Sequence, residues 1–116
     1  MMQWHVRAEL SADGDLKFDG AMLNGTPVDL LVAAVAGCFS KSCQMVQEAR
    51  GEPKTTVIAE VTGTKGEGSP NRVGHVRIAW SLPDLDSDKA ARIAKDGKRI
   101  CTVTNAMSCE FEVTEL

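Results

Sequence analysis

Residues 26–40 read TPVDLLVAAVAGCFS, and this stretch decides how the rest of the chain has to fold. Thr26 is a residue type that caps helices, Pro27 suits the first helical position, and Asp29 adds an acid to the first turn. Gly51 is a typical signal for the end of a helix. The sequence therefore predicts a helix of about 24 residues, about 36 Å long, that ends just before this glycine.

The first half of this helix, residues 30–39, is apolar on every side. A helix that is apolar all round is buried all round. A chain of 116 residues forms one domain with a limited core, so one copy covers only part of such a helix. We therefore predict a two-fold homodimer, with a tightly wrapped monomer as the alternative. The second half of the helix is expected to emerge toward water because it carries Lys41, Gln44, Gln47, Glu48 and Arg50.

Apolar and polar residues alternate in five other segments, and this period of two predicts strands. The first two segments, within residues 2–19, are separated by the turn signal Asp13-Gly14 and form a predicted hairpin. Residues 65–71 are rich in Gly, Ser and Pro and predict the loop of a second hairpin. The five predicted strands contain residues 3–10, 16–18, 57–62, 76–80 and 110–114.

A second helix is predicted to start at Asp86 or Ser87, because apolar residues then recur at helical spacing. Gly97 weakens this helix by about 1 kcal/mol relative to Ala, which indicates a close packing contact. The apolar stripe consists of Ala90, Ile93, Ala94, Gly97 and Cys101. The order strand, strand, helix, strand, strand, helix, strand predicts a single α+β domain over residues 1–116.

Composition narrows the class of protein. Hydrophobic residues make up 43% and charged residues 25%, which is typical of a globular protein and not of a disordered chain. The net charge of -3 argues against a general nucleic-acid-binding protein. The N-terminal segment lacks the apolar core of a signal peptide, and the longest apolar run has nine residues, against about 20 for a membrane span. We therefore expect a soluble cytoplasmic protein with neither a membrane nor a nucleic-acid partner.

The reactive groups of this sequence are four cysteines: Cys38, Cys43, Cys101 and Cys109. Their spacing does not match the paired ligands of a structural zinc site, and hydrolase, metalloprotease and phosphate-loop motifs are absent from the sequence. Cys38 and Cys101 each end an apolar helix stripe and are predicted to point inward. They are either a reactive thiol pair or two small buried hydrophobic residues. Cys43 and Cys109 are expected to be structural.

Two motifs resemble the OsmC/Ohr family, the osmotically inducible and organic hydroperoxide resistance proteins. Residues 26–40 resemble the helix of that family, in which a Pro opens a long apolar segment that ends in a cysteine. Residues 100–107, ICTVTNAM, resemble its second signature, Cys-Pro-x-Ser-Asn-Ala-hydrophobic. The separation of Cys38 and Cys101 is also similar to that of the family, and the resemblance covers nearly the whole chain.

The resemblance implies an intertwined α+β homodimer, in which two long helices pack back to back and sheets from both chains wrap them. It implies thiol-dependent reduction of organic hydroperoxides, with Cys38 as the peroxidatic and Cys101 as the resolving cysteine. A small thiol or a lipoyl-type dithiol would be the reductant, and neither a metal nor an organic cofactor is required. The alternatives are a non-peroxidatic protein that binds a small apolar ligand, and a redox-sensing module.

Peroxidases of this family activate the cysteine with an arginine from the N-terminal segment, which a glutamate near the helix start holds in place. Here Val28 stands at the position of that glutamate, so the sequence departs from the peroxidase pattern. Arg7, which shares a strand face with His5, is the candidate for the arginine, reaching Cys38 either directly or from a partner chain. An ordinary solvent-facing residue is the alternative for Arg7.

Overall fold

The computed structural model describes residues 2–20 and 25–116. Within these ranges the chain forms five strands and three helices, in an order that matches the predicted one apart from an additional short helix. The elements are β1 (Gln3–Leu10), β2 (Leu16–Gly20), α1 (Pro27–Ala49), β3 (Val57–Lys65), β4 (Val73–Ser81), α2 (Ser87–Ile100), α3 (Thr102–Asn105) and β5 (Glu110–Glu115). The predicted loop over residues 20–25 falls mostly outside the described residues.

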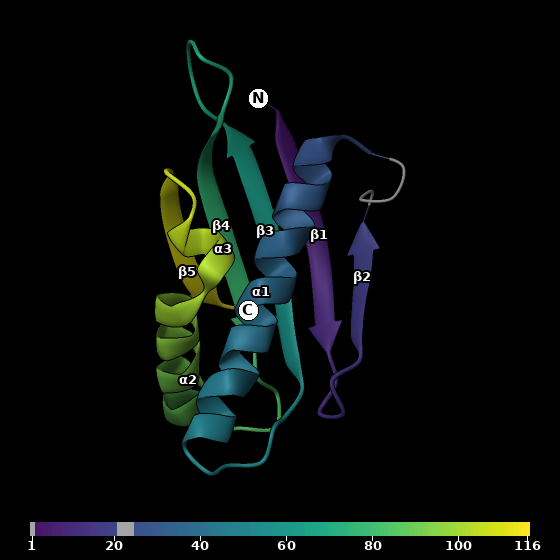
Figure 1. Cartoon of the computed structure of the whole chain (residues 1–116), viewed down its shortest axis with the longest axis vertical. Coiled ribbons are helices and arrows are strands. Elements are labelled where there is room, and N and C mark those ends of the chain that lie inside the picture. The colour runs from purple at the N-terminus through teal and green to yellow at the C-terminus, as the bar shows by residue number, and fades with distance from the viewer. Residues whose placement is uncertain (1, 21–24) are drawn as a thin grey trace.

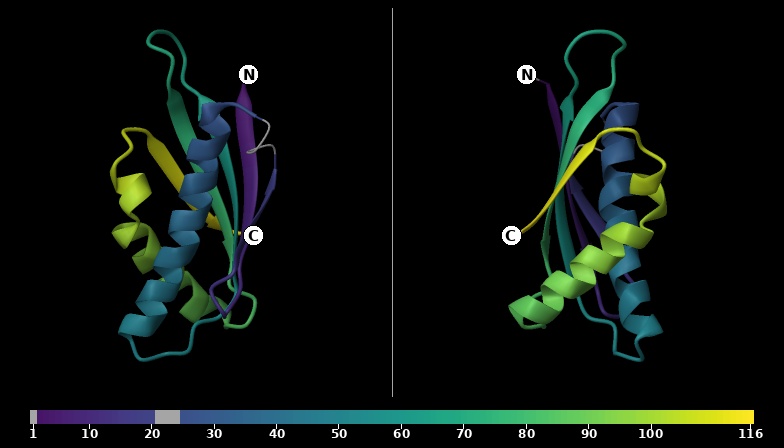
Figure 2. Two further views of the ribbon diagram at one scale, coloured as in Figure 1. Left: turned by 45° about the vertical axis from the view of Figure 1, so that its right-hand side comes forward. Right: turned by 90° about the vertical axis from the view of Figure 1, so that its left-hand side faces the viewer.

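The strands form one sheet with the order β2-β1-β3-β4-β5. Neighbouring strands are antiparallel except β4 and β5, which run parallel because α2 and α3 carry the chain back between them. α1 lies across the sheet over β1 and β3, and α2 lies beside it (Figure 1). Seen from the side, the sheet and the helices form two layers (Figure 2). The fold is therefore an α+β domain in which one sheet face is covered by helices.

Successive side chains of each strand point to opposite faces of the sheet, so every second side chain faces α1. On β1, Val6, Ala8 and Leu10 are fully buried, and the central positions of β3 and β4 follow the same pattern. Burying one such aliphatic side chain contributes about 1.5–3 kcal/mol relative to leaving it exposed. The core also contains Val57, Ala59, Val61, Val76 and Ile78 of the sheet and Val32, Val35, Ala36 and Phe39 of α1.

The start of α1 follows the local chemistry of its first residues. The backbone N–H of Thr26 donates to Asp29 Oδ2 at 2.7 Å, and the Thr26 hydroxyl donates to the same oxygen at 3.2 Å. These bonds satisfy groups that the first turn leaves without helical partners. At the other end Gly51 adopts a φ of +71°, which glycine tolerates without strain.

The second half of α1 is more buried than its polar sequence indicates. Gln44 is 5% exposed and its amide donates to the carbonyl oxygens of Ser11 and Thr55, at 2.8 and 3.0 Å. Gln47 is fully buried and exchanges two hydrogen bonds with Thr55. The expectation that both glutamines face water was therefore wrong, because loop carbonyl oxygens satisfy the amide of Gln44, and the hydroxyl and backbone N–H of Thr55 satisfy that of Gln47.

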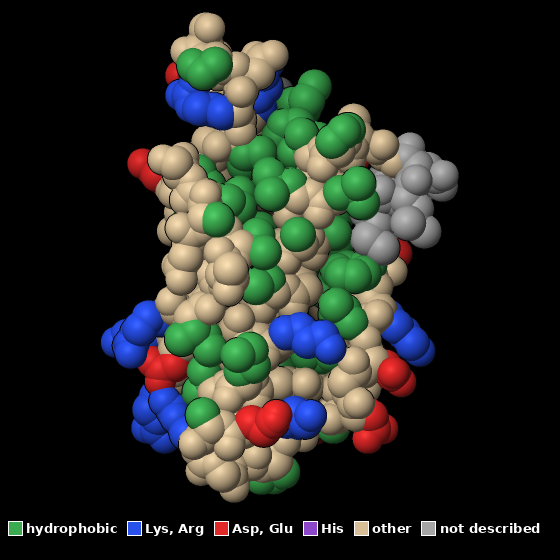
Figure 3. Space-filling view, viewed as in Figure 1, with side chains coloured by type: hydrophobic (Ala, Val, Ile, Leu, Met, Phe, Trp, Pro, Cys, Tyr) green, Lys and Arg blue, Asp and Glu red, His purple; other side chains and the backbone are tan. Residues whose placement is uncertain are grey.

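α1 has the length and the mean hydropathy of a membrane span, but 61% of its most apolar window is buried inside the protein. A helix that packs against a sheet in this way is the core helix of a globular domain. Its outward face nevertheless carries apolar side chains. Leu30 is 54% exposed and Met45 is 60% exposed, and hydrophobic side chains gather along this face (Figure 3).

Candidate thiol site

Cys38 and Cys101 come together between α1 and the junction of α2 with α3. Cys38 lies in the middle of α1 and is half-buried, whereas Cys101 is fully buried and caps both α2 and α3. Cys101 and Cys38 lie close enough for their thiols to interact, and this interaction raises the pKa of Cys101. The two cysteines that the sequence singled out are therefore neighbours, 63 residues apart along the chain.

The surroundings of Cys101 favour its neutral thiol. Burial raises the pKa of Cys101, and its interaction with the neighbouring Cys38 raises this pKa further. Hydrogen bonds from the side chain and the backbone of Thr104 act in the opposite direction and lower the pKa. Of the two sulfurs, that of Cys38 is the more accessible to solvent.

Local contacts hold the turn that carries Cys101. The Thr104 hydroxyl lies 3.2 Å from the carbonyl oxygen of Cys101, and Thr104 itself is 2% exposed. The amide of Asn105 donates to the carbonyl oxygen of Arg99 at 3.0 Å. These bonds tie α3 back to the end of α2, so the cysteine between them has little freedom to move. α3 has only four residues, which is too few for a helical periodicity to be detected in the sequence.

Arg7 lies on the other side of the sheet. Val6 and Ala8 point to α1, so Arg7 between them points away from it, and its guanidinium pairs with Glu9 at 3.5 Å and Glu60 at 3.9 Å. Within one protomer Arg7 does not reach Cys38, which corrects the expectation of a direct approach. The reason is the strand's period of two, which separates the apolar and polar faces by the thickness of the sheet.

The position of the family's glutamate is apolar and distant from the thiols. Val28 is half-buried and lies ten residues before Cys38, about 15 Å along the helix axis. It lines a cavity with Trp4 and Val73, away from the cysteine pair. The pair of activating residues that the resemblance implies is thus not assembled beside Cys38 by a single copy of this chain.

The other two cysteines have different surroundings. Cys43 is fully buried, and this burial raises its pKa far above the ordinary thiol value. The nearby Cys101 adds a smaller effect in the same direction. A side chain at Gly97 would lie 2.7 Å from the sulfur of Cys43, so the glycine permits the close packing of α2 on α1 that its position in the apolar stripe indicated. Cys109 is half-buried, and burial raises its pKa while the charge of Lys98 lowers it.

Within residues 2–20 and 25–116, no group of three or more His, Cys, Asp or Glu side chains is arranged to hold a metal ion.

Comparison with known proteins places this fold and its two cysteine motifs in one family. Residues 13–115 match the family described as OsmC-like protein. This chain belongs to the OsmC-like family. The match begins after β1. No curated protein sequence is significantly similar to this OsmC-like chain.

Solved structures share the OsmC-like fold at low identity. An organic hydroperoxide resistance protein OsmC from Legionella pneumophila is 14% identical, with a TM-score of 0.67 over 99% of this chain and 95% of that chain. The organic hydroperoxide resistance protein OhrB of Bacillus subtilis is 17% identical, with a TM-score of 0.60 over 100% and 98%. An organic hydroperoxide resistance protein from Elizabethkingia anophelis is 20% identical, with a TM-score of 0.63 over 78% of this chain and 67% of that chain. At these identities the likeness establishes the fold alone.

Proposed function

We propose that this OsmC-like protein is a thiol-dependent peroxidase that reduces organic hydroperoxides, with Cys38 as the peroxidatic and Cys101 as the resolving cysteine. The observation that carries the proposal is that the two thiols, one half-buried and one fully buried, are neighbours. Membership of a family with hydroperoxide resistance proteins among its structural neighbours supports the same activity.

The reaction needs only the two thiols and an external reductant. The Cys38 thiolate attacks the terminal oxygen of the hydroperoxide, the O–O bond breaks, and the alcohol leaves with a proton, so that Cys38 becomes a sulfenic acid. The sulfur of Cys101 then attacks that of Cys38, water leaves, and a disulfide forms. A small thiol or a lipoyl-type dithiol returns two electrons and restores both thiols. We expect this cycle in the cytoplasm, where thiols are kept reduced.

A homodimer is part of the proposal. Leu30, Leu31 and Met45 are exposed on α1, and Ile100 at the end of α2 is 44% exposed. The same face is mostly hydrophobic in the upper half of α1 (Figure 3). Covering it with a second copy would remove apolar surface from water at about 25 cal/mol per Å². An apolar wall beside Cys38 would then favour an alkyl hydroperoxide over hydrogen peroxide, by about 0.8 kcal/mol for each buried methylene.

One observation favours a second candidate function. Val28 stands at the position of the family's carboxylate and Arg7 faces away from α1, so neither member of that activating pair lies beside Cys38 in its own protomer. A protein without that activation would bind a small apolar ligand or use the disulfide as a redox signal, with slow peroxide turnover.

The decisive experiment follows consumption of cumene hydroperoxide by the purified protein in the presence of a dithiol reductant. We expect turnover by the parent protein, none by Cys38→Ser, and unchanged turnover by Cys109→Ser, which removes a thiol outside the pair. Equal consumption by the parent and Cys38→Ser would contradict the proposal and leave the ligand-binding function.

A further inference from the structure

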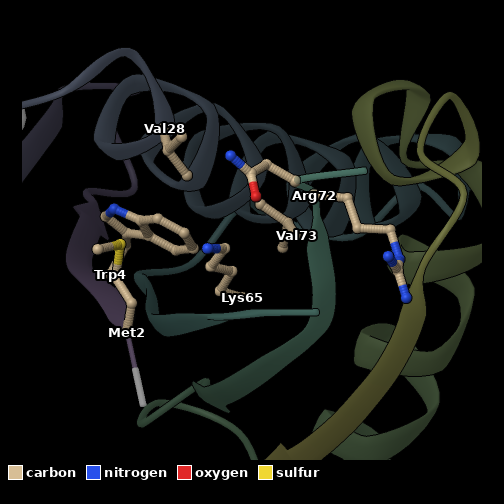
Figure 4. Close-up of a pocket in the computed structure, with 7 residues that line it drawn as sticks. Met2, Trp4, Val28, Lys65, Arg72 and Val73 are labelled. Carbon is tan, nitrogen blue, oxygen red and sulfur yellow. The ribbon is translucent and has the colours of Figure 1, made fainter. Parts of the chain in front are cut away.

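The cavity that Val28 lines has a volume of about 300 Å³ and lies where the first turn of α1 meets the ends of β1, β3 and β4 (Figure 4). This volume is at the low end of the range for small-molecule sites, about 300–1,000 Å³. Met2, Trp4, Val28 and Val73 give it apolar walls. Because Val28 and Cys38 are about 15 Å apart along α1, the cavity is separate from the thiols of its own protomer.

A glycine shapes the apolar floor of this cavity. A side chain at Gly63 would lie 3.1 Å from Val32, 3.6 Å from Val73 and 3.7 Å from Trp4. Because Gly63 has no side chain, the indole of Trp4 and the side chain of Val73 pack close to α1. Trp4 and Val28 face the same space in Figure 4, as the walls of a slot for a flat or extended apolar group do.

The polar part of the lining is positive. Lys65 and Arg72 both line the cavity, and neither takes part in an ion pair among the described residues. The guanidinium of Arg72 turns back to the carbonyl oxygen of Pro70, 3.1 Å away, so its stem faces the cavity. The amine of Lys65 lies beside Trp4 and Val73 (Figure 4). Asp29, the acid next to Val28 in sequence, is already hydrogen-bonded to Thr26.

We propose that this cavity binds a small amphipathic carboxylate, with its alkyl or aryl part between Trp4 and Val28 and its carboxylate paired with the amine of Lys65. Apolar walls alone would accept any hydrophobic compound. The amine of Lys65 is exposed and has no acidic partner among the described residues, so it selects an anion, since a hydrogen bond between two charged groups is stronger than one between neutral groups. The site requires no peroxide chemistry and does not depend on the proposed peroxidase activity.

The test compares octanoate with octan-1-ol, two ligands with equal carbon number and different head-group charge. Binding to the whole protein is measured by calorimetry and by the fluorescence of Trp4, using a Trp80→Phe variant if the second tryptophan obscures the signal. We expect octanoate to bind at least about tenfold more tightly than octan-1-ol. Lys65→Gln removes this preference, whereas Lys54→Gln, at an exposed lysine outside the cavity, retains it.

Three outcomes would overturn the proposal: equal affinity for the acid and the alcohol, no effect of Lys65→Gln, or no binding at all because a second copy fills the cavity. Cys38→Ser separates this site from the thiol site. Octanoate binding should be unchanged in that variant even though it has lost peroxide turnover, and loss of binding would place the ligand at the thiols.

Discussion

Cys101 lies beside Cys38 across the contact between α3 and α1, where the proximity of Cys38 raises the pKa of the Cys101 thiol. Cys101 is fully buried and Cys38 is half-buried, so an oxidant arriving from solvent meets Cys38 first. This asymmetry assigns different roles to two residues of the same type, and it leads to the first two predictions.

Peroxide treatment is expected to produce an intramolecular disulfide between Cys38 and Cys101. Thiols that are already neighbours need only a small approach to reach the bonding distance of about 2 Å between the sulfurs. Peptide mapping of the protein oxidised with one equivalent of cumene hydroperoxide checks this pairing. Finding Cys38 linked only to Cys43 or Cys109 would contradict it.

The closure of that disulfide is expected to accelerate with rising pH. Burial raises the pKa of Cys101, so its attacking thiolate becomes abundant only above the ordinary thiol value of about 8.5. Thr104→Val removes a hydrogen bond that lowers the pKa of Cys101. The curve of closure rate against pH should therefore move to higher pH, and closure should be slower than in the parent protein at any pH below the pKa of Cys101. Trapping the Cys38 sulfenic acid with dimedone at successive times measures the rate.

Thr102→Val is the matched control for that experiment, since Thr102 is an exposed threonine of the same short helix. Its profile should coincide with that of the parent protein. A closure rate independent of pH, or coincident profiles for Thr104→Val and the parent, would show that Cys101 does not attack as a thiolate.

Gly97→Ala is expected to destabilise the protein by about 1–3 kcal/mol, the usual range for overpacking. Alanine would gain about 1 kcal/mol of helix propensity, but its Cβ would lie 2.7 Å from the sulfur of Cys43 and 3.2 Å from its backbone nitrogen. Urea denaturation measures the change in free energy of unfolding, with the exposed substitution Arg92→Ala in the same helix as the control. A Cys43→Ala/Gly97→Ala double variant should recover part of the loss, and an increase in stability for Gly97→Ala alone would refute the packing argument.

Leu30→Glu is expected to convert a dimer into a monomer. The substitution places a charge in the exposed apolar face of α1, where burial against a second copy would be costly. Sedimentation at several concentrations measures the molecular mass, and the exposed substitution Lys54→Gln, which also makes the net charge one unit more negative, controls for the change of charge. A monomeric parent protein that is stably folded at high concentration would contradict the homodimer.

Arg7→Ala is expected to leave peroxide consumption close to that of the parent, because ion pairs with Glu9 and Glu60 hold the guanidinium on the outer face of the sheet. Arg77→Ala is the matched control, since Arg77 pairs with Glu112 on the same face. Both changes should alter stability by under about 0.5 kcal/mol. Loss of activity in Arg7→Ala alone would instead show that Arg7 reaches Cys38 from a partner chain.

The sequence alone determined the elements whose signals are local. Helix capping at Thr26, the stop at Gly51 and the period of two in the strands depend on neighbours along the chain, so they predicted the α+β order closely. The two cysteine motifs also revealed the family, and the apolar stripes predicted that Cys38 and Cys101 would both point inward.

The tertiary structure decided everything that depends on which segments meet. Only packing shows that Gln47 is buried against Thr55, that β5 runs parallel to β4, and that the sheet separates Arg7 from Cys38. The cavity beside Lys65 likewise forms from four elements that are distant in sequence. Local chemistry dictates where an element begins and which of its faces is apolar, whereas the partner of each polar group is set by long-range contacts that no short window of sequence contains.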